Sequence, residues 1–361
     1  MPRLPALTLF WRFFFGLLVA ALLPLLITWY FARDVTTKNA QRLAEAKLRT
    51  EAAQIASHAD GWLNVNYESL SEHADTIAMR SMLPELQRPV LIAIANHQPW
   101  TQLAFTVSPD GMSLARSDSL APIDYKDRPY FKTAMAGQPL GQIIGISRTT
   151  NRPSWIFGVP IKDEQGKVVG VLAKTNGLNE LTDQLANVHI GDSGRAILLA
   201  PDGKLAGMTG AVFDKELRDF SKHKLFTDRE NARNGVLHYD DETGRAMVAA
   251  LQPVRFGWLV AVQMDEAEAL APVADVDREM GGLLFGAAVL AALFAAVFAP
   301  GLSRPLVQLT TIADDMSRGH FDHEVPGTNR RDEVGALSRA IERMTRSLRL
   351  AMERLTKNEG G

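Results

Sequence analysis

The sequence predicts an α+β protein with a long N-terminal helix, two tandem antiparallel-sheet lobes, two transmembrane helices and a C-terminal helical segment. Three observations predict this architecture. Two long uncharged apolar runs bracket most of the chain, strand-and-turn patterns occur in two successive sets between the runs, and an apolar seam at helical spacing follows the second run. Because only helices satisfy their backbone within a bilayer, we expect each run to be a helix and the residues between them to form one module.

The two apolar runs are residues 13–31 and 281–302. Each has the ~20 residues that a helix needs to cross the hydrocarbon core. Arg3 and Arg12 precede the first run, as basic residues precede the core of a cleaved signal peptide. The run nevertheless exceeds the ~7–15 residues of such a core, and bulky residues stand at its end, where cleavage requires small ones. We therefore expect an uncleaved membrane anchor.

Flanking charges predict the orientation of the two spans. Residues 1–12 carry arginines without acids, acids crowd residues 265–279 before the second run, and arginines follow it from Arg304. Lys and Arg favour the cytoplasmic side of a span. We expect residues 1–12 and those after the second run in the cytoplasm, residues 32–280 outside, and a location in the cell inner membrane.

Between the runs, helix-forming residues come first and strands follow. Ala, Gln, Glu, Lys and Leu dominate residues 39–54, so we expect a long helix from 32 to about 88. The strands expected after it include 103–107, 142–148, 154–159, 167–174, 195–199, 235–239, 245–253 and 258–264. Pro109-Asp110-Gly111 and Pro201-Asp202-Gly203 each lie between an apolar strand and a returning strand. This repeat predicts tandem copies of a small antiparallel-sheet domain.

The segment Asp124-Tyr125-Lys126-Asp127-Arg128-Pro129-Tyr130-Phe131, with the strands and turns after it, resembles the signature of extracellular double-Cache sensors. Residues 257–262 resemble the last strand of the membrane-proximal lobe of that family. The likeness covers about residues 35–275. It implies two PAS-like lobes, a distal lobe at about 89–187 and a proximal lobe at about 188–275, and in this family the distal lobe usually holds a small ligand.

The resemblance implies that the ligand contacts the 124–131 segment. Arg128 offers a planar guanidinium that binds a carboxylate through two hydrogen bonds, and Tyr130 adds an amphipathic ring. The other candidate ligand contacts are Lys126, Arg148 and Trp155. Structural roles stay open for some of these residues: Arg128 can form an ion pair with Asp127, Tyr130 can belong to the core, and Trp155 can pack under the sheet.

The class of ligand follows from positions that differ from the family pattern. Amino-acid-binding members carry an aromatic residue five positions before the Arg, Trp-Tyr after it and an acid on a later strand. Here these positions read Ile123, Tyr130-Phe131 and Thr175. Without the acid, the ammonium group of a free amino acid has no partner. The sequence therefore favours a small carboxylate over a free amino acid.

No motif supports catalysis, a metal site or a cofactor. The eight histidines lack metal-ligand spacing, neither a nucleophile elbow nor a phosphate-binding loop occurs, and the chain has no Cys. His320 and His323 are close together, but the acids beside them indicate a solvated connector. The formal net charge of -2 argues against a nucleic-acid partner. We expect no enzyme here.

After the second run the sequence predicts two helices joined by a connector, with Gly319 and Phe321 ending the first helix. The second helix starts near Asp332, and its apolar residues recur in steps of three and four at 334, 337, 341, 344, 348, 351 and 355. Such an a/d seam needs a partner helix. The pattern resembles a cytoplasmic HAMP domain at 303–355. The resemblance implies a four-helix bundle from two subunits and signalling roles for Pro305, Asp332, Glu333 and Gly335.

These resemblances imply a transmembrane receptor that senses a small extracellular ligand and works as a homodimer. Residues 356–361 form a short tail without a kinase, cyclase or methyl-accepting helix. We therefore expect the output to belong to a separate cytoplasmic protein that acts in trans, or to have been lost. One alternative is a membrane-anchored ligand-binding or scaffold protein without signalling output. A membrane-anchored hydrolase is a third hypothesis.

Overall fold

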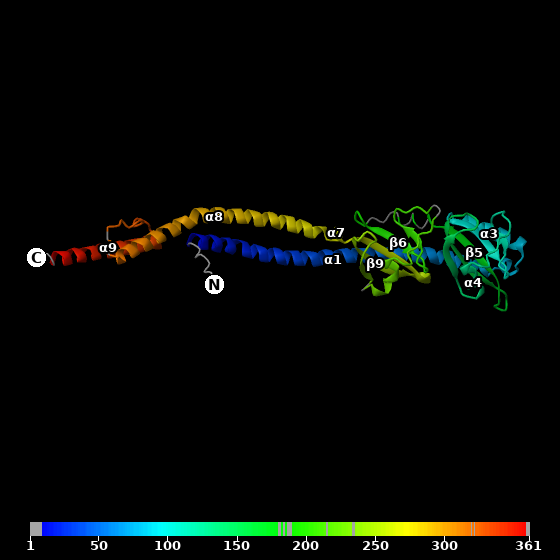
Figure 1. Ribbon diagram of the computed structural model, residues 1–361. Coiled ribbons are helices and arrows are strands. Elements are labelled where there is room, and N and C mark those ends of the chain that lie inside the picture. The colour runs from blue at the N-terminus through cyan, green and yellow to red at the C-terminus, as the bar shows by residue number, and fades with distance from the viewer. Residues whose placement is uncertain are drawn as a thin grey trace. The chain divides into compact units, whose positions relative to one another are not determined.

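The computed structural model describes residues 9–358 apart from 180–181, 183–184, 186–189, 214–215, 233–234, 319 and 321. The chain divides into two compact units, Thr37–Pro272 and the combination of Met1–Thr36 with Val273–Gly361. The first unit holds two sheets, and two helices of the chain are long and apolar enough to cross a membrane (Figure 1). The predicted fold class is confirmed.

The first apolar run belongs to a single helix, α1 (Leu9–Ala74). Helix was expected from 32 to about 88, but α1 ends at Ala74, and α2 (Ile77–Arg80) and α3 (Pro84–His97) follow as separate helices. Leu83 explains the second break, because a residue before proline is steered away from helical dihedrals and Leu83 is extended, with φ -99° and ψ 117°. Pro84 then suits the first turn of α3, where its missing N–H costs nothing.

The two lobes are five-stranded antiparallel sheets with equivalent strand orders, β2-β1-β5-β4-β3 and β7-β6-β10-β9-β8. The distal strands are β1 (Thr101–Val107), β2 (Ser113–Arg116), β3 (Gly141–Ile146), β4 (Pro153–Lys162) and β5 (Val168–Gly177). The proximal strands are β6 (Arg195–Leu199), β7 (Leu205–Met208), β8 (Val236–Asp240), β9 (Ala246–Val254) and β10 (Trp258–Asp265). An irregularity in register occurs at the equivalent place in both lobes, at Thr106/Val107 and Leu198/Leu199. The repeat expected from the two Pro-Asp-Gly turns is therefore present in the backbone.

Trp155 on β4 joins α1 to both lobes. Its side chain is fully buried, and its ring stacks on Phe157 with centroids 3.9 Å apart. The ring centroid lies 5.1 Å from that of Trp62 on α1 and 5.6 Å from that of Trp258 in the proximal lobe. Gln142 connects the lobes through hydrogen bonds, because its Oε1 accepts the Nε1–H of Trp155 at 3.2 Å and of Trp258 at 2.9 Å.

A lysine is buried on the same face of the distal sheet. Lys174 on β5 is 1 % exposed. Its Nζ donates to the side-chain oxygen of Asn66 on α1 at 2.8 Å and to that of Gln98. Burial disfavours the ammonium form and lowers the pKa of Lys174 from 10.5 to about 7. The sheet and α1 are thus linked through a polar cluster in which the lysine meets amide oxygens.

The chain continues from β10 through α7 (Glu266–Ala269) into α8 (Ala271–Ser317), which contains the second apolar run and Pro305. The expected helix break at 319 and 321 lies outside the described residues. The second helix, α9, covers Glu333–Asn358 and begins where the sequence predicts. Asp332 Oδ1 accepts the backbone N–H of Gly335 at 3.0 Å, and a hydrogen bond from Arg330 lowers the pKa of Asp332 to about 2.

Gly335 and the seam show how α9 packs. A Cβ at Gly335 would lie 2.1 Å from the carbonyl oxygen of Arg330, so only glycine fits there. Thr345 is buried and donates to Met316 Sδ of α8 at 3.0 Å. The seam side chains at 337, 344 and 348 are instead 43 %, 48 % and 41 % exposed. The a/d seam is therefore open at these three positions of the single chain.

Candidate ligand site

A short helix covers the face of the distal sheet that points away from α1. This helix is α4 (Pro129–Met135), and its Tyr130, Phe131 and Ala134 pack with Tyr125 against the sheet. Gly141 on β3 permits the close approach, because a Cβ there would lie 1.9 Å from the carbonyl oxygen of Tyr130. The backbone of the sheet therefore fixes where the start of α4 lies.

Arg128 and Tyr130 lie at this start of α4. Arg128 is the residue that precedes the helix, and its Nη2 donates to the carbonyl oxygen of Ile146 at 3.2 Å. Arg128 Nε and Tyr130 Oη are both buried and have no hydrogen-bond partner among the described residues. Burial raises the pKa of Tyr130 well above its usual value, so its hydroxyl stays a donor. Buried polar groups in folded proteins almost always have partners, so two such donors together indicate a place for an acceptor.

Arg148 and Lys126 are exposed, unlike the Arg128 Nε and Tyr130 Oη atoms. Arg148 Nη2 pairs with Asp127 Oδ2 at 2.7 Å, and its Nη1 donates to the carbonyl oxygen of Asp124. The ion pair of Asp127 is therefore with Arg148, whereas the side chain of Arg128 bonds Ile146. The side chain of Lys126 is exposed.

Trp155 lies on a different face of the sheet from Arg128 and Tyr130, two of the other candidate ligand contacts. Alternation along β4 places Ile156 against α4 and Trp155 on the opposite face, in the core with α1. The structural role that the sequence left open for Trp155, packing under the sheet, matches its position. We therefore leave Trp155 out of the proposed ligand contacts.

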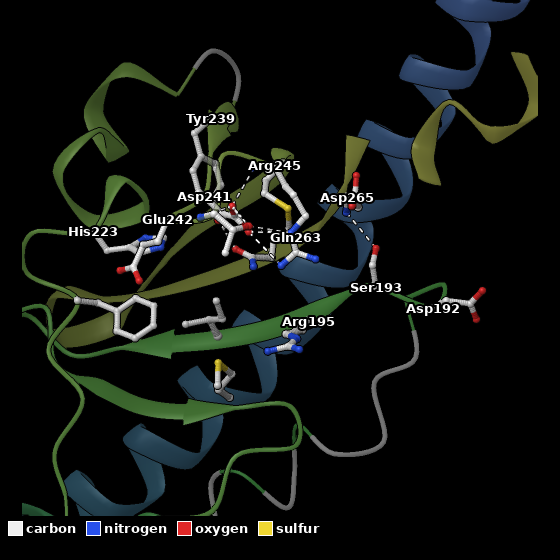
Figure 2. A pocket seen from close by; sticks show the side chains of 16 residues that line it. Asp192, Ser193, Arg195, His223, Tyr239, Asp241, Glu242, Arg245, Gln263 and Asp265 are labelled. Atoms are coloured by element: carbon white, nitrogen blue, oxygen red, sulfur yellow. Dashed lines mark hydrogen bonds and ion pairs between the residues drawn. The ribbon is translucent and has the colours of Figure 1, made fainter. Parts of the chain in front are cut away.

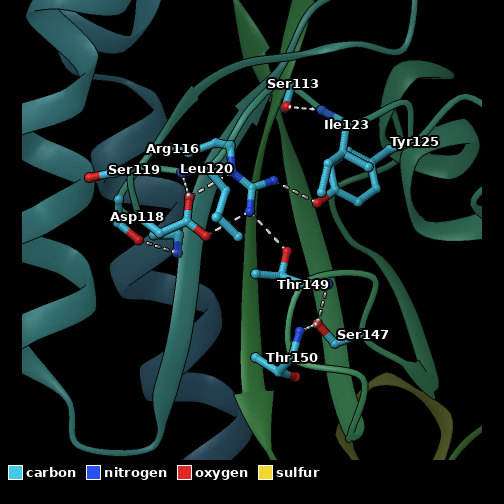
Figure 3. Close-up of polar contacts among 12 residues, drawn as sticks. Ser113, Arg116, Asp118, Ser119, Leu120, Ile123, Tyr125, Ser147, Thr149 and Thr150 are labelled. Carbon is cyan, nitrogen blue, oxygen red and sulfur yellow. Dashed lines mark hydrogen bonds and ion pairs between the residues drawn. The ribbon is translucent and has the colours of Figure 1, made fainter.

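A buried arginine that the sequence did not single out forms a polar network with Tyr125 (Figure 3). Arg116 at the end of β2 is 5 % exposed and forms two 2.7 Å hydrogen bonds to the carboxylate of Asp118. It also donates to Tyr125 Oη at 3.0 Å and to Thr149 Oγ1 at 2.9 Å. The hydrogen bonds from Arg116 lower the pKa of Asp118 and hold it ionised. This network positions Tyr125, which packs beside Tyr130.

The comparisons with known proteins identify the domains of the chain. A family model for the Cache domain matches residues 36–273, and one for the HAMP domain matches residues 301–350. The chain belongs to the Cache domain family. A Cache domain combined with a HAMP domain is the architecture of a signal transduction receptor, and this family is sensory rather than enzymatic.

The methyl-accepting chemotaxis protein TlpA of Bacillus subtilis (strain 168) is 24 % identical over 224 residues, which are 62 % of this chain and 33 % of TlpA. The chain thus spans a third of the length of that relative. Among solved structures, the extracellular domain of the candidate histidine kinase rpHK1S-Z16 has a TM-score of 0.56 at 20 % identity, covering 64 % of this chain and 98 % of that one. The ligand-binding domain of the Pseudomonas fluorescens chemoreceptor CtaA with L-serine has a TM-score of 0.51 at 18 % identity. The match covers 63 % of this chain and 99 % of the CtaA domain. At these identities the Cache domains share the fold.

Proposed function

We propose that this chain is a transmembrane receptor that binds a small carboxylate in its distal Cache lobe. The observation that carries the proposal is the pair of buried donors without partners, Arg128 Nε and Tyr130 Oη. A carboxylate supplies acceptors to both, and its charge matches the guanidinium, which is always ionised. Hydrogen bonds to charged groups contribute about 1.5–3 kcal/mol each, enough to select an anion.

Thr175 supports a plain carboxylate over a free amino acid. It lies on β5, 2 % exposed, opposite Leu103 of the same sheet. CtaA has been solved with L-serine, L-leucine and L-isoleucine. An ammonium group needs an anionic partner when it leaves water, and a threonine hydroxyl is neutral. We infer that the distal lobe of this chain takes ligands without that ammonium group.

Replacing Arg128 with alanine should weaken carboxylate binding about 10–150-fold, because one charge-assisted contact is lost. Calorimetric titration of the purified full-length chain in nanodiscs with acetate, lactate, pyruvate and succinate measures this. Arg148→Ala is the matched control, since its exposed ion pair with Asp127 should contribute less than about 1 kcal/mol. An Arg128→Ala chain that binds as tightly as the wild type would contradict the assignment.

A homodimer and a membrane location complete the proposal. The open a/d seam of α9 needs a second apolar surface, and a second copy of the chain supplies an identical one. Asp277 at the outer edge of the second apolar run accepts the Nε1–H of Trp29 at 3.0 Å and pairs with Arg33 at 3.4 Å, which supports two spans side by side. We infer that the sheets lie outside the inner membrane and that HAMP passes the signal to a separate cytoplasmic protein.

Single cysteines at Ile341 and Leu348 should form disulfides between subunits in native membranes, because both positions belong to the seam. The wild-type chain has no Cys, so each variant carries one thiol. Cysteine at Arg346, on the charged side of α9, is the control and should cross-link far less. Equal cross-linking at all three positions, or none at the seam, would argue against the dimer.

A further inference from the structure

The proximal lobe contains a cavity of about 450 Å³ (Figure 2). It is lined by Gln263 and Asp265 of β10, which alternate with Trp258 and therefore lie on the sheet face away from the shared core. The segment that carries Phe220 and His223 also lines the cavity. A volume of this size is typical of pockets for small ligands.

The backbone around this cavity repeats the backbone around the distal site. In the distal lobe, Tyr125 N donates to Gly111 O at 2.7 Å, and Arg128 N donates to Tyr125 O at 2.9 Å. In the proximal lobe, Phe220 N donates to Gly203 O and His223 N to Phe220 O, both at 2.9 Å. Isolated bridges also correspond, Met112 with Asp124 and Lys204 with Asp219. By this correspondence His223 stands in the proximal lobe where Arg128 stands in the distal lobe.

The strand register adds a second correspondence. On β5, Thr175 is opposite Leu103, and on β10, Gln263 is opposite Arg195. Gln263 therefore occupies the position of Thr175. The proximal lobe thus presents an imidazole and an amide at the two positions where the distal lobe presents a guanidinium and a hydroxyl.

These two side chains offer donors to the cavity. His223 Nδ1 accepts the backbone N–H of Leu225 at 3.2 Å, so the neutral ring carries its hydrogen on Nε2. Gln263 Oε1 accepts the hydroxyl of Tyr239 at 2.5 Å, which leaves the amide N–H groups for another partner. Each of these groups can donate a hydrogen bond to a ligand oxygen in the cavity.

The charges on the walls have both signs. Asp241 and Arg245 neutralise one another across 3.1 Å. Glu242 and Arg195 also line the cavity and make no ion pair within the described residues. Glu242 lies beside His223 (Figure 2), whereas Arg195 on β6 is the strand partner of Gln263 on β10. Two further acids of the lining have no ion pair among the described residues: Asp265 Oδ1 accepts the backbone N–H of Ala267 at 2.9 Å, and Asp192 points away from the other lining residues (Figure 2). Arg195 is thus the cation, and Glu242 the acid, that remain for a ligand.

We propose that this cavity is a second ligand site of the Cache domain, which takes a small zwitterion such as a free amino acid. Its carboxylate lies toward Arg195 and the Gln263 amide, and its ammonium group lies toward Glu242. This site is separate from the distal carboxylate site and does not depend on Arg128. The two lobes then report different ligands to one membrane helix.

Protection of a single thiol tests the site. Met208 lines the cavity and is half-buried, so Met208→Cys in the full-length chain places one reactive thiol there. Its alkylation by N-ethylmaleimide is measured in nanodiscs with each standard amino acid except cysteine, whose thiol would consume the reagent, at millimolar concentration. At least one amino acid should slow the labelling, and Arg128→Ala should leave this protection intact. Thr243→Cys, at an exposed position of the cavity wall, repeats the test if Met208→Cys folds poorly.

The charged partners give the decisive comparison. Arg195→Gln and Glu242→Gln should each raise the amino-acid concentration needed for protection about 10–100-fold, the loss expected for one charge-assisted contact. The matched controls Arg218→Gln and Glu230→Gln are exposed, lie outside the cavity and should change nothing. Three results overturn the proposal: no protection by any amino acid, protection unchanged in both cavity variants, or protection lost with Arg128→Ala. The last result would assign the effect to the distal lobe.

Discussion

Replacing Trp155 with alanine should lower the free energy of unfolding by about 3–5 kcal/mol, the usual cost of removing a large buried aromatic side chain. The ring touches Trp62 on α1, Phe157 on its own strand and Trp258 in the other lobe, so no single element can move to fill the space. Urea unfolding of the purified chain, followed by circular dichroism, measures the change.

Trp155→Phe is the control for packing. It keeps a ring against Phe157 but removes the indole N–H that donates to Gln142, so we expect a loss near 1 kcal/mol. An alanine variant as stable as the phenylalanine variant would mean that the aromatic cluster does not join the two lobes to α1.

Replacing Lys174 with methionine should stabilise the chain at pH 7 and remove part of its pH dependence. The unfolded lysine has a pKa of 10.5 and the folded one a pKa of about 7, so between these values the unfolded state binds more protons. The free energy of unfolding of the wild type therefore rises with pH across this window, by up to about 1.4 kcal/mol per pH unit. As the pH falls from 10.5 to about 7, the wild type loses the same amount of stability. Below about pH 7 both states are protonated and the contribution is constant.

The difference in unfolding free energy between wild type and Lys174→Met isolates this contribution from other titrating groups. At pH 7 the variant should be more stable by a few kcal/mol, about 3–6 before the loss of the Asn66 hydrogen bond is counted. The advantage should shrink toward pH 10. Lys167→Met, at an exposed turn, is the control and should show no such trend. A difference that is flat from pH 7 to 10 would contradict a depressed lysine pKa.

Local patterns were enough to predict most of the fold. The Pro-Asp-Gly turns, the apolar runs and the capping residue Asp332 act over a few residues, so the strands, spans and α9 follow from them. The break after Ala74 was missed because residues 75–83 contain no strong breaker before Pro84. The partner that each face of a strand packs against depends on the tertiary structure, so the local sequence does not predict it. Trp155 and Ile156 look equally apolar in sequence, yet only Ile156 faces α4.

The candidate site was only partly predictable for the same reason. Arg128 and Tyr130 were found from a family pattern, but their lack of partners depends on the packing of α4 against the sheet. Arg116 ends an ordinary strand, and nothing local marks it as buried. His223 and Gln263 were hidden because the loop after the Pro-Asp-Gly turn is longer in the proximal lobe than in the distal lobe, which breaks the sequence repeat. The backbone hydrogen bonds and strand pairings show which residues of the two lobes correspond.

We propose that a carboxylate held by Arg128 in the distal lobe changes the packing of the HAMP dimer. The rate of disulfide formation by Leu348→Cys, in right-side-out membrane vesicles, measures that packing directly. The carboxylate identified by titration is added outside, with and without Arg128→Ala. We predict that the ligand changes the cross-linking rate in the Leu348→Cys chain and that Arg128→Ala abolishes the response. A saturating ligand that leaves the rate unchanged, or a response that persists in the Arg128→Ala chain at the same concentration, would contradict the claim.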